Sequence, residues 1–181
     1  HEAHLRVARA ASVALGNAPV HLLPNAVPPH RPRPGASGEH RRAMLAAAVA
    51  DDERLVVDDR ELHRDGPSYT LDTLREFRAE VGERPLVFLV GADSYAQLDQ
   101  WRDWQHYPEL CHLAVAPRPD APEPPAAVAG AFEVTRDPAE LAARPAGRAL
   151  LLDGPELDIS ATALRAALKA GEAVEGLPPG V

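Results

Sequence analysis

The sequence predicts an α/β fold: a Rossmann-like, open and mainly parallel sheet with helices on both faces. Short apolar runs alternate along the chain with longer segments whose apolar residues recur at helical spacing. Most of the short runs are apolar at nearly every position, as strands are when both faces of their sheet are covered. Alternation of this kind is typical of parallel sheets. We expect one domain over residues 1–181, because this length suits a single core.

The first half of the chain alternates two helices with two strands. Apolar residues at helical spacing predict helices over residues 2–16 and 37–51. The runs "PVHLLPN" (19–25) and "RLVVDD" (54–59) are short and apolar, which favours strands. The Pro-rich stretch between the first strand and the second helix, residues 28–38, is expected to be a surface loop.

The second half begins with a helix over residues 69–82. Leu71, Leu74 and Phe77 share one face of that helix, and Gly82 supplies its stop. A fourth helix is expected at 93–104, and a second Pro-rich stretch, 117–130, is expected to be a loop. The remaining strands are expected at "PLVFLVGAD", "HLAVAPR" and "RALLLDG", residues 85–93, 112–118 and 148–154.

Composition and charge exclude several classes of protein. The formal net charge of −8 argues against a general nucleic-acid or membrane-surface binder, which is usually basic. The single cysteine, Cys111, cannot form an internal disulfide, and no apolar run approaches eighteen residues. We therefore expect a cytoplasmic protein. The chain opens directly on a helical pattern without Met, so we also expect further residues before His1 in the complete protein.

Polar or unusual residues follow three of the predicted strands: Pro24-Asn25, Gly91–Ser94 and Pro117-Arg118. In open parallel sheets, ligands bind beyond the carboxyl ends of the strands. If these strands are neighbours, the three groups meet at one edge and form a site. Each group alone also fits ordinary turn chemistry.

The segment "LDISATALRAALKAG", residues 157–171, begins as a helix with unusual chemistry. Where a first turn normally carries an acid, this one carries the hydroxyls of Ser160 and Thr162 and the cation of Arg165. One interpretation is that an anionic ligand supplies the missing negative charge. The other is an ordinary capped helix with a solvated arginine.

Two further groups of residues have both a functional and a plain interpretation. His1 and His4 share a face of the first helix and could donate to phosphate oxygens, but they could also be exposed chain-end histidines or bind a structural metal. Trp101 and Trp104, three residues apart on a predicted helix, could pack in the core. Trp101 could instead stack on an aromatic ligand.

Taken together, the motifs resemble those of bacterial nicotinate mononucleotide adenylyltransferases, in the HxGH nucleotidyltransferase superfamily. The resemblance covers essentially the whole chain and its motifs occur in the family's order. They are "HEAH" for part of the family's Gly-rich opening, then "LLPNAVPPHR", "PSYTLDTL", "VGADS", "QW", "RP" and "ISATALR". The resemblance implies that a strand and a Gly-rich loop precede His1.

The family's reaction is the attack of the 5′-phosphate of nicotinate mononucleotide on the α-phosphorus of ATP, with Mg²⁺ accompanying ATP. The resemblance implies catalytic roles for His4, His1 and Arg165. It implies ATP binding by His4, Gly91, Asp93, Ile159, Ser160, Thr162 and Arg165. It implies mononucleotide binding by Asn25, His30, Ser68, Thr70, Trp101, Arg102 and Arg118. No nucleic acid or membrane partner is expected, and a homo-oligomer is left open.

The sequence departs from the family pattern at two positions. Ala3 occupies the place of a family glycine that lets the nucleotide approach the helix closely, and Arg102 replaces a tyrosine that often follows the stacking Trp. The alternatives are therefore a related adenylyltransferase, acting on nicotinamide mononucleotide or phosphopantetheine, and a non-catalytic nucleotide-binding module.

Overall fold

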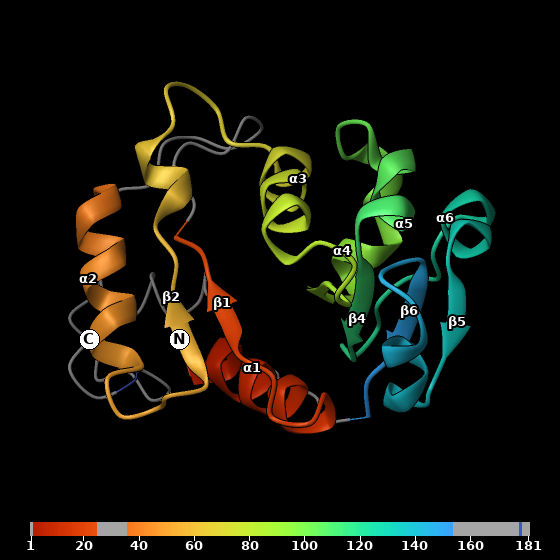
Figure 1. Cartoon of the computed structure of the whole chain (residues 1–181), viewed down its shortest axis with the longest axis horizontal. Coiled ribbons are helices and arrows are strands. Elements are labelled where there is room, and N and C mark those ends of the chain that lie inside the picture. Colours follow the sequence, from red (N-terminus) through yellow and green to blue (C-terminus); the bar gives the residue numbers. More distant parts are fainter. Residues whose placement is uncertain (1, 25–35, 154–177, 179–181) are drawn as a thin grey trace. The chain divides into compact units, whose positions relative to one another are not determined.

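The computed structural model describes residues 2–24, 36–153 and 178 (Figure 1). The chain divides into two compact units, with described residues 2–24, 36–63 and 178 in the first and 64–153 in the second. Every strand pair in these described ranges is parallel, and helices alternate with the strands. The predicted α/β class with a mainly parallel sheet is therefore confirmed. One domain over residues 1–181 stays a prediction.

The first unit is built around a two-stranded parallel sheet in which Val20 pairs with Leu55. Helix α1 buries Leu5, Ala8 and Ala11 on one face, as its apolar spacing predicts. Ser37 caps α2 by accepting a hydrogen bond from the backbone N–H of His40. The elements are α1 (Glu2–Ala14), β1 (Val20–Leu22), α2 (Gly38–Ala48), β2 (Leu55–Val57) and the 3₁₀ turn η1 (Arg60–His63).

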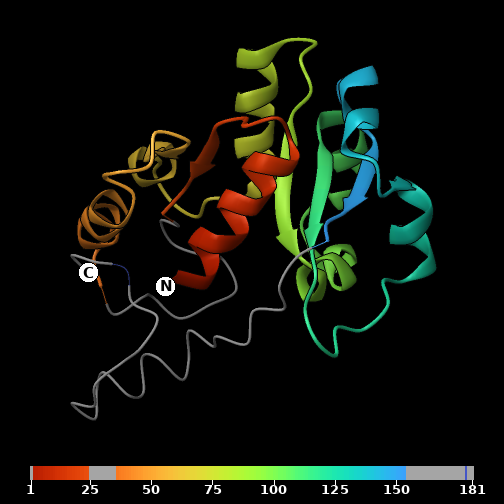
Figure 2. The ribbon, with the colours of Figure 1, turned by 90° about the horizontal axis from the view of Figure 1, so that it is seen from below.

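The second unit holds a four-stranded parallel sheet in the order β3-β4-β6-β5, whose strands lie side by side in two views (Figures 1 and 2). All five residues of β4 are buried, because strands cover it on both edges and side chains cover both faces. The elements are α3 (Thr70–Val81), β3 (Val87–Gly91), α4 (Ala92–Ala96), η2 (Leu98–Gln100), η3 (Trp104–His106), α5 (Tyr107–Leu110), β4 (His112–Ala116), α6 (Ala126–Ala131), β5 (Glu133–Thr135), η4 (Pro138–Ala143) and β6 (Arg148–Leu151).

Helix α3 follows its prediction closely. Leu71, Leu74 and Phe77 are buried in one face, and the helix ends at Gly82, whose φ of 60° few other residues adopt readily. The backbone N–H of Gly82 donates to the carbonyl of Arg78, which closes the last turn. The apolar face joins a core that includes residues of β3, β4 and β6.

The predicted helix over residues 93–104 is wrong as a continuous element. It consists of α4, η2 and η3, with Trp101 in an extended conformation (φ −86°, ψ 145°) and Asp103 in the left-handed region. Trp101 and Trp104 therefore do not share a helix. The break turns the Trp101 ring toward Phe88, so tertiary packing of one large ring outweighs the helical pattern.

Strand β5 and helix α6 are among the short elements that were outside the predictions. Strand β5 has only three residues at the sheet edge, with Glu133 and Val134 exposed, which is too short and too polar for an apolar-run signal. Helix α6 begins within the stretch predicted as a loop, 117–130. It begins after Pro125 and buries Val128 completely, because an alanine-rich run after a proline is a good helix start.

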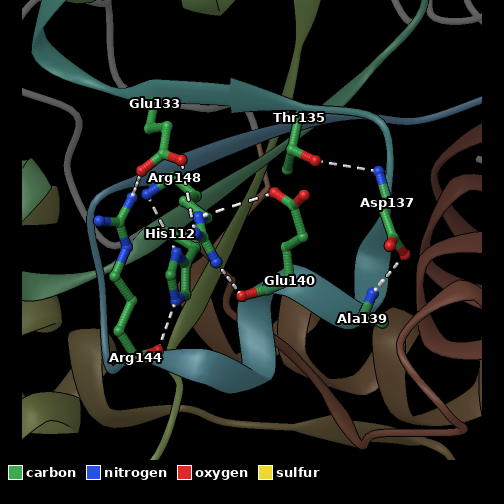
Figure 3. A network of polar contacts seen from close by, with 8 residues as sticks. All are labelled: His112, Glu133, Thr135, Asp137, Ala139, Glu140, Arg144 and Arg148. Carbon is green, nitrogen blue, oxygen red and sulfur yellow. Dashed lines mark hydrogen bonds and ion pairs between the residues drawn. The ribbon is translucent and has the colours of Figure 1, made fainter.

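A polar network holds the amino-terminal ends of β4, β5 and β6 together around His112, which is fully buried (Figure 3). Nδ1 of His112 accepts from the backbone N–H of Arg148 at 3.0 Å, and Nε2 donates to the carbonyl of Arg144 at 2.8 Å. Arg144 and Arg148 both pair with Glu133, and Arg148 also donates to the backbone carbonyl of Glu140. This pattern requires a neutral imidazole, since a protonated Nδ1 cannot accept.

We expect the stability of the protein to fall as His112 protonates. Burial lowers its pKa below the ordinary value, with the charges of Arg144 and Arg148 acting in the same direction. The stabilising contribution is thus complete above about pH 6.5, the pKa of an unfolded histidine, and is lost as the pH falls below that value. His112→Gln should cost about 1–3 kcal/mol at pH 8, and this cost should shrink toward pH 5.

Urea unfolding of both proteins at pH 8 and pH 5 measures this change, with His63→Gln as the control because that imidazole is well exposed. Asp52 and Asp58, whose pKa values neighbouring arginines lower to about 2, lose their pairing only in more acidic solution. A gap between wild type and His112→Gln that is equal at the two pH values would contradict the expectation.

Candidate active site

Two of the three predicted polar groups meet at the carboxyl edge of the second unit's sheet. Gly91 at the end of β3 pairs in register with Ala116 at the end of β4, so the residues that follow both strands start side by side. The guanidinium of Arg118 lies 3.6 Å from the carboxylate of Asp93. The predicted convergence of Gly91–Ser94 and Pro117-Arg118 is confirmed. Pro24 follows β1 in the other unit, and Asn25 lies outside the described residues.

The carboxylate of Asp93 lies close to the backbone of Gly91. A Cβ placed on it would lie 2.6 Å from Oδ1 of Asp93, closer than real contacts allow. The carboxylate thus folds back over the end of β3, beside the first turn of α4. Asp93 and Arg118 are both substantially exposed, so this edge offers one carboxylate and one cation to a ligand.

A second group of predicted residues gathers at the start of α3. The side chain of Thr70 hydrogen-bonds to the phenol of Tyr107, and the ring of Tyr107 packs edge-on against Trp101 with centroids 6.3 Å apart. The guanidinium carbon of Arg102 lies 4.3 Å from the centre of the Tyr69 ring. The structure therefore brings the segments 68–70 and 101–102 together, although more than thirty residues separate them in the chain.

Tyr107 joins these segments and was missed by sequence reasoning. Its ring packs edge-on against Phe88, at 6.5 Å, and against Trp101, at 6.3 Å, and its hydroxyl hydrogen-bonds to Thr70. Burial raises the pKa of this phenol far above its ordinary value, so it stays protonated and serves as a hydrogen-bonding group. No local pattern marks Tyr107, because its role comes from contacts made across the fold.

Trp101 is half-buried in this group and forms edge-to-face contacts with Phe88 and Tyr107. Core packing, which was one of the two interpretations of this residue, is thus part of its role. In edge-to-face packing, the edge of one ring contacts the face of another. These contacts hold the indole of Trp101 in its orientation. Stacking of a ligand on the indole stays a prediction.

In the first unit, His4 is exposed on α1 and its neighbour Ala3 is buried, with 4% of its surface accessible. Partial dehydration by surrounding atoms lowers the pKa of His4, so its imidazole is mainly neutral at pH 7. A neutral imidazole still donates one hydrogen bond. The methyl of Ala3 lies on the buried face of α1, whereas the imidazole of His4 is accessible.

Several predicted site residues cannot be placed. They lie outside the described residues: His1, Asn25, His30, Ile159, Ser160, Thr162 and Arg165. The roles that the resemblance implies for these residues stay predictions.

Other kinds of site find little support in the part of the chain that the structure describes. No group of three His, Cys, Asp or Glu residues there is arranged to hold a metal ion. Burial raises the pKa of the Cys111 thiol to about 12, which makes it a poor nucleophile. No helix among the described residues is both long and apolar enough to cross a membrane.

The fold and the site define a class, and comparison with known proteins identifies it. The cytidylyltransferase-like family model matches residues 1–167, so this is a nucleotidyltransferase of that class. A probable nicotinate-nucleotide adenylyltransferase of Marinobacter nauticus is 44% identical over 99% of this chain and 85% of its own length. One of Aeromonas hydrophila is 47% identical over 94% of this chain and 81% of its own. The chain belongs to the nicotinate-nucleotide adenylyltransferase family.

A solved structure agrees with this assignment at the level of the fold. The Plasmodium falciparum nicotinic acid mononucleotide adenylyltransferase, complexed with NaAD, superimposes with a TM-score of 0.64. The match covers 93% of this chain and 82% of that one, at 12% sequence identity. The resemblance found in the sequence motifs is confirmed by the curated relatives, at 44% and 47% identity.

Proposed function

We propose that the protein transfers the adenylyl group of ATP to nicotinate mononucleotide, forming nicotinate adenine dinucleotide and pyrophosphate in the biosynthesis of NAD. The observation that carries this proposal is the 44% identity to a probable nicotinate-nucleotide adenylyltransferase over 99% of the chain. The meeting of segments 68–70 and 101–102 supports it, because both resemble mononucleotide-binding segments of that family.

The chemistry asks mainly for alignment. An oxygen of the mononucleotide phosphate bonds to the α-phosphorus of ATP, the bond to the bridging oxygen breaks, and pyrophosphate leaves with that electron pair. The nucleophile is already an anion, so neither a strong base nor a covalent intermediate is required. Positioning and compensation of the phosphate charges supply the acceleration.

ATP would be held by the residues that the resemblance implies for its phosphates and its adenosine. His4 and His1 would donate to its phosphates, Ser160 and Thr162 would donate to the β- and γ-phosphates, and Arg165 would neutralise them. Gly91, Asp93 and Ile159 would contact the adenosine. Asp93 is suited to a ribose because its carboxylate accepts from hydroxyls, and Gly91 permits close approach.

A divalent metal accompanies ATP in this class, and we propose Mg²⁺. This ion keeps several waters and binds substrate phosphates, with only one or two protein carboxylates. Binding through the substrate's phosphates needs no cluster of three protein ligands, and the described residues contain none. The metal would offset negative charge on the transferring and leaving phosphates.

The mononucleotide would occupy the region around α3's first turn. Trp101 would stack on the pyridine ring, and the backbone N–H of Thr70 with nearby Ser68 would meet the carboxylate. The Thr70 hydroxyl is already engaged with Tyr107, which leaves the backbone for the ligand. Arg118, Asn25 and His30 would face the phosphate.

The preference between nicotinate mononucleotide and nicotinamide mononucleotide depends on the charge around the pyridine substituent. Arg102 lies over Tyr69, the residue that immediately precedes α3, and adds a cation beside the helix's own positive end. Its family counterpart is often tyrosine, so this chain places extra positive charge where a carboxylate would sit. We therefore favour nicotinate mononucleotide over its neutral amide. Phosphopantetheine has no flat ring for Trp101.

Turnover with the two mononucleotides tests the proposal. With ATP and Mg²⁺, we expect pyrophosphate release to be at least tenfold faster with nicotinate mononucleotide than with the amide, by kcat/KM. Preference for the amide would overturn the choice of substrate. Tight ATP binding without pyrophosphate release would instead support a non-catalytic nucleotide-binding module.

The buried free thiol of Cys111 suits the reducing cytoplasm, which we propose as the location.

A further inference from the structure

Arg64 forms a two-pronged contact with α3. Its Nη1 donates to the hydroxyl of Thr73 at 2.8 Å, and its Nη2 lies 2.7 Å from the carboxylate of Glu76 in an ion pair. Thr73 and Glu76 are three residues apart and so lie on one side of the helix. Arg64 is only 19% exposed in its side chain, and the Thr73 it contacts is buried. The planar guanidinium therefore spans about one helical turn.

This contact closes a loop over the residues that precede α3. The loop 64–69 includes Gly66, with φ of 92°, and ends at Tyr69, which begins the helix without a side-chain cap. The Tyr69 carbonyl accepts from the backbone N–H groups of Asp72 and Thr73, at 3.0 and 3.3 Å. A six-residue loop with a flexible glycine has many accessible conformations. A bond from its first residue to the helix removes most of them.

The first turn of α3 is consequently held at two points. Thr70 is bonded to Tyr107, which packs against Trp101, and Thr73 is bonded to Arg64. One contact relates the turn to the aromatic group, and the other relates it to the loop that carries Ser68. Together the two contacts restrict where the backbone N–H groups at the start of the helix lie relative to the indole of Trp101.

We propose that Arg64 is a positioning residue for the mononucleotide site: it orders the 64–69 loop and aligns the first turn of α3 with Trp101. The inference rests on the proposed function for the identity of the ligand. Arg64 acts through Thr73 and not on the ligand, because Glu76 already balances its charge and its side chain is largely covered. The contact combines one hydrogen bond, from Nη1 to Thr73, with an ion pair between Nη2 and Glu76 that lacks hydrogen-bond geometry. A single lysine ammonium would reproduce these two contacts less well than the planar guanidinium does.

Three substitutions test the role by steady-state kinetics. Arg64→Gln should raise the KM for nicotinate mononucleotide about tenfold, with kcat and the KM for ATP within about twofold. Thr73→Val, which removes the hydroxyl at nearly constant shape, should reproduce most of this rise, and Arg64→Lys should be intermediate. Arg75→Gln is the matched control. This exposed arginine lies on α3, as Thr73 does, and its ion pair with Asp72 is long, at 3.7 Å.

The double variant Arg64→Gln/Thr73→Val should be no worse than the more affected single variant, because both changes break the same bond. Hydrogen exchange gives a readout that needs no substrate. Arg64→Gln should speed exchange at the Asp72 and Thr73 amides at least tenfold and leave β4 unchanged.

The two proposals fail in different ways. If wild type turns over nicotinate mononucleotide but Arg64→Gln changes neither its KM nor the exchange at α3, the positioning role is overturned and the function stands. If wild type forms no dinucleotide while Arg64→Gln still frees the first turn, the function falls and the ordering of the turn by Arg64 is upheld. Full additivity of the two single variants also counts against the inference.

Discussion

His4→Ala is expected to lower kcat about 100- to 1,000-fold, because it removes a hydrogen-bond donor from the proposed phosphate site. The side chain is exposed and alanine is a good helix former, so the free energy of unfolding should change by less than about 0.5 kcal/mol. His4→Gln retains an N–H donor and should recover part of the loss. Steady-state measurement of pyrophosphate release and urea unfolding of each variant check both statements.

The matched control for His4 is His106→Gln, since His106 is also exposed and forms an ion pair with Glu109, three residues along the chain. It should leave kcat within twofold of wild type, an estimate in line with ordinary surface substitutions. A loss of less than about threefold in His4→Ala would mean that the imidazole does not contact the reacting phosphates.

Trp101→Ala should have the largest effect on mononucleotide binding. Loss of a stacking face costs about 1–3 kcal/mol per ring, so we expect the KM for nicotinate mononucleotide to rise about 10- to 100-fold. The KM for ATP should change little. Because the indole also packs on Phe88 and Tyr107, the variant should lose about 2–3 kcal/mol of unfolding free energy.

Trp104→Ala separates binding from stability. Trp104 is partly buried against the same core as Trp101, so its removal should cost a similar unfolding free energy. It should not raise the KM for the mononucleotide by more than about twofold, since we assign it no ligand contact. Equal rises in KM in the two variants would show that Trp101 acts through packing alone. Trp101→Phe, which keeps an aromatic face, should lie between wild type and Trp101→Ala.

Elements with a dense apolar pattern could be predicted, because the apolar residues that become buried follow one another at regular spacing in the sequence. Strand β4 is apolar along nearly its whole length and is completely buried, and α3 shows its buried face at regular spacing. Strand β5 could not be found in the same way. Its two exposed residues and three-residue length leave no period to detect, and it forms only because β6 offers an edge.

The candidate site divides along similar lines. The meeting of Asp93 with Arg118 could be predicted, because the carboxyl ends of adjacent parallel strands always share an edge. The roles of Tyr107 and Arg64 could not, because each depends on partners that the chain approaches only after folding. The same is true of Trp101, whose packing on Phe88 breaks the helix predicted over 93–104.

The amino-acid sequence alone determined the α/β class, the positions of the main strands along the chain and the family. Apolar periodicity and the order of motifs can both be recognised from residues close together in the chain. The tertiary structure added what no local pattern contains, namely which groups form hydrogen bonds with one another. A hydrogen bond such as that of Arg64 to Thr73, or of His112 to the backbone of Arg144 and Arg148, depends on distances of a few tenths of an ångström. Such distances are set by the packing of the whole unit, which is why they must be read from the structure.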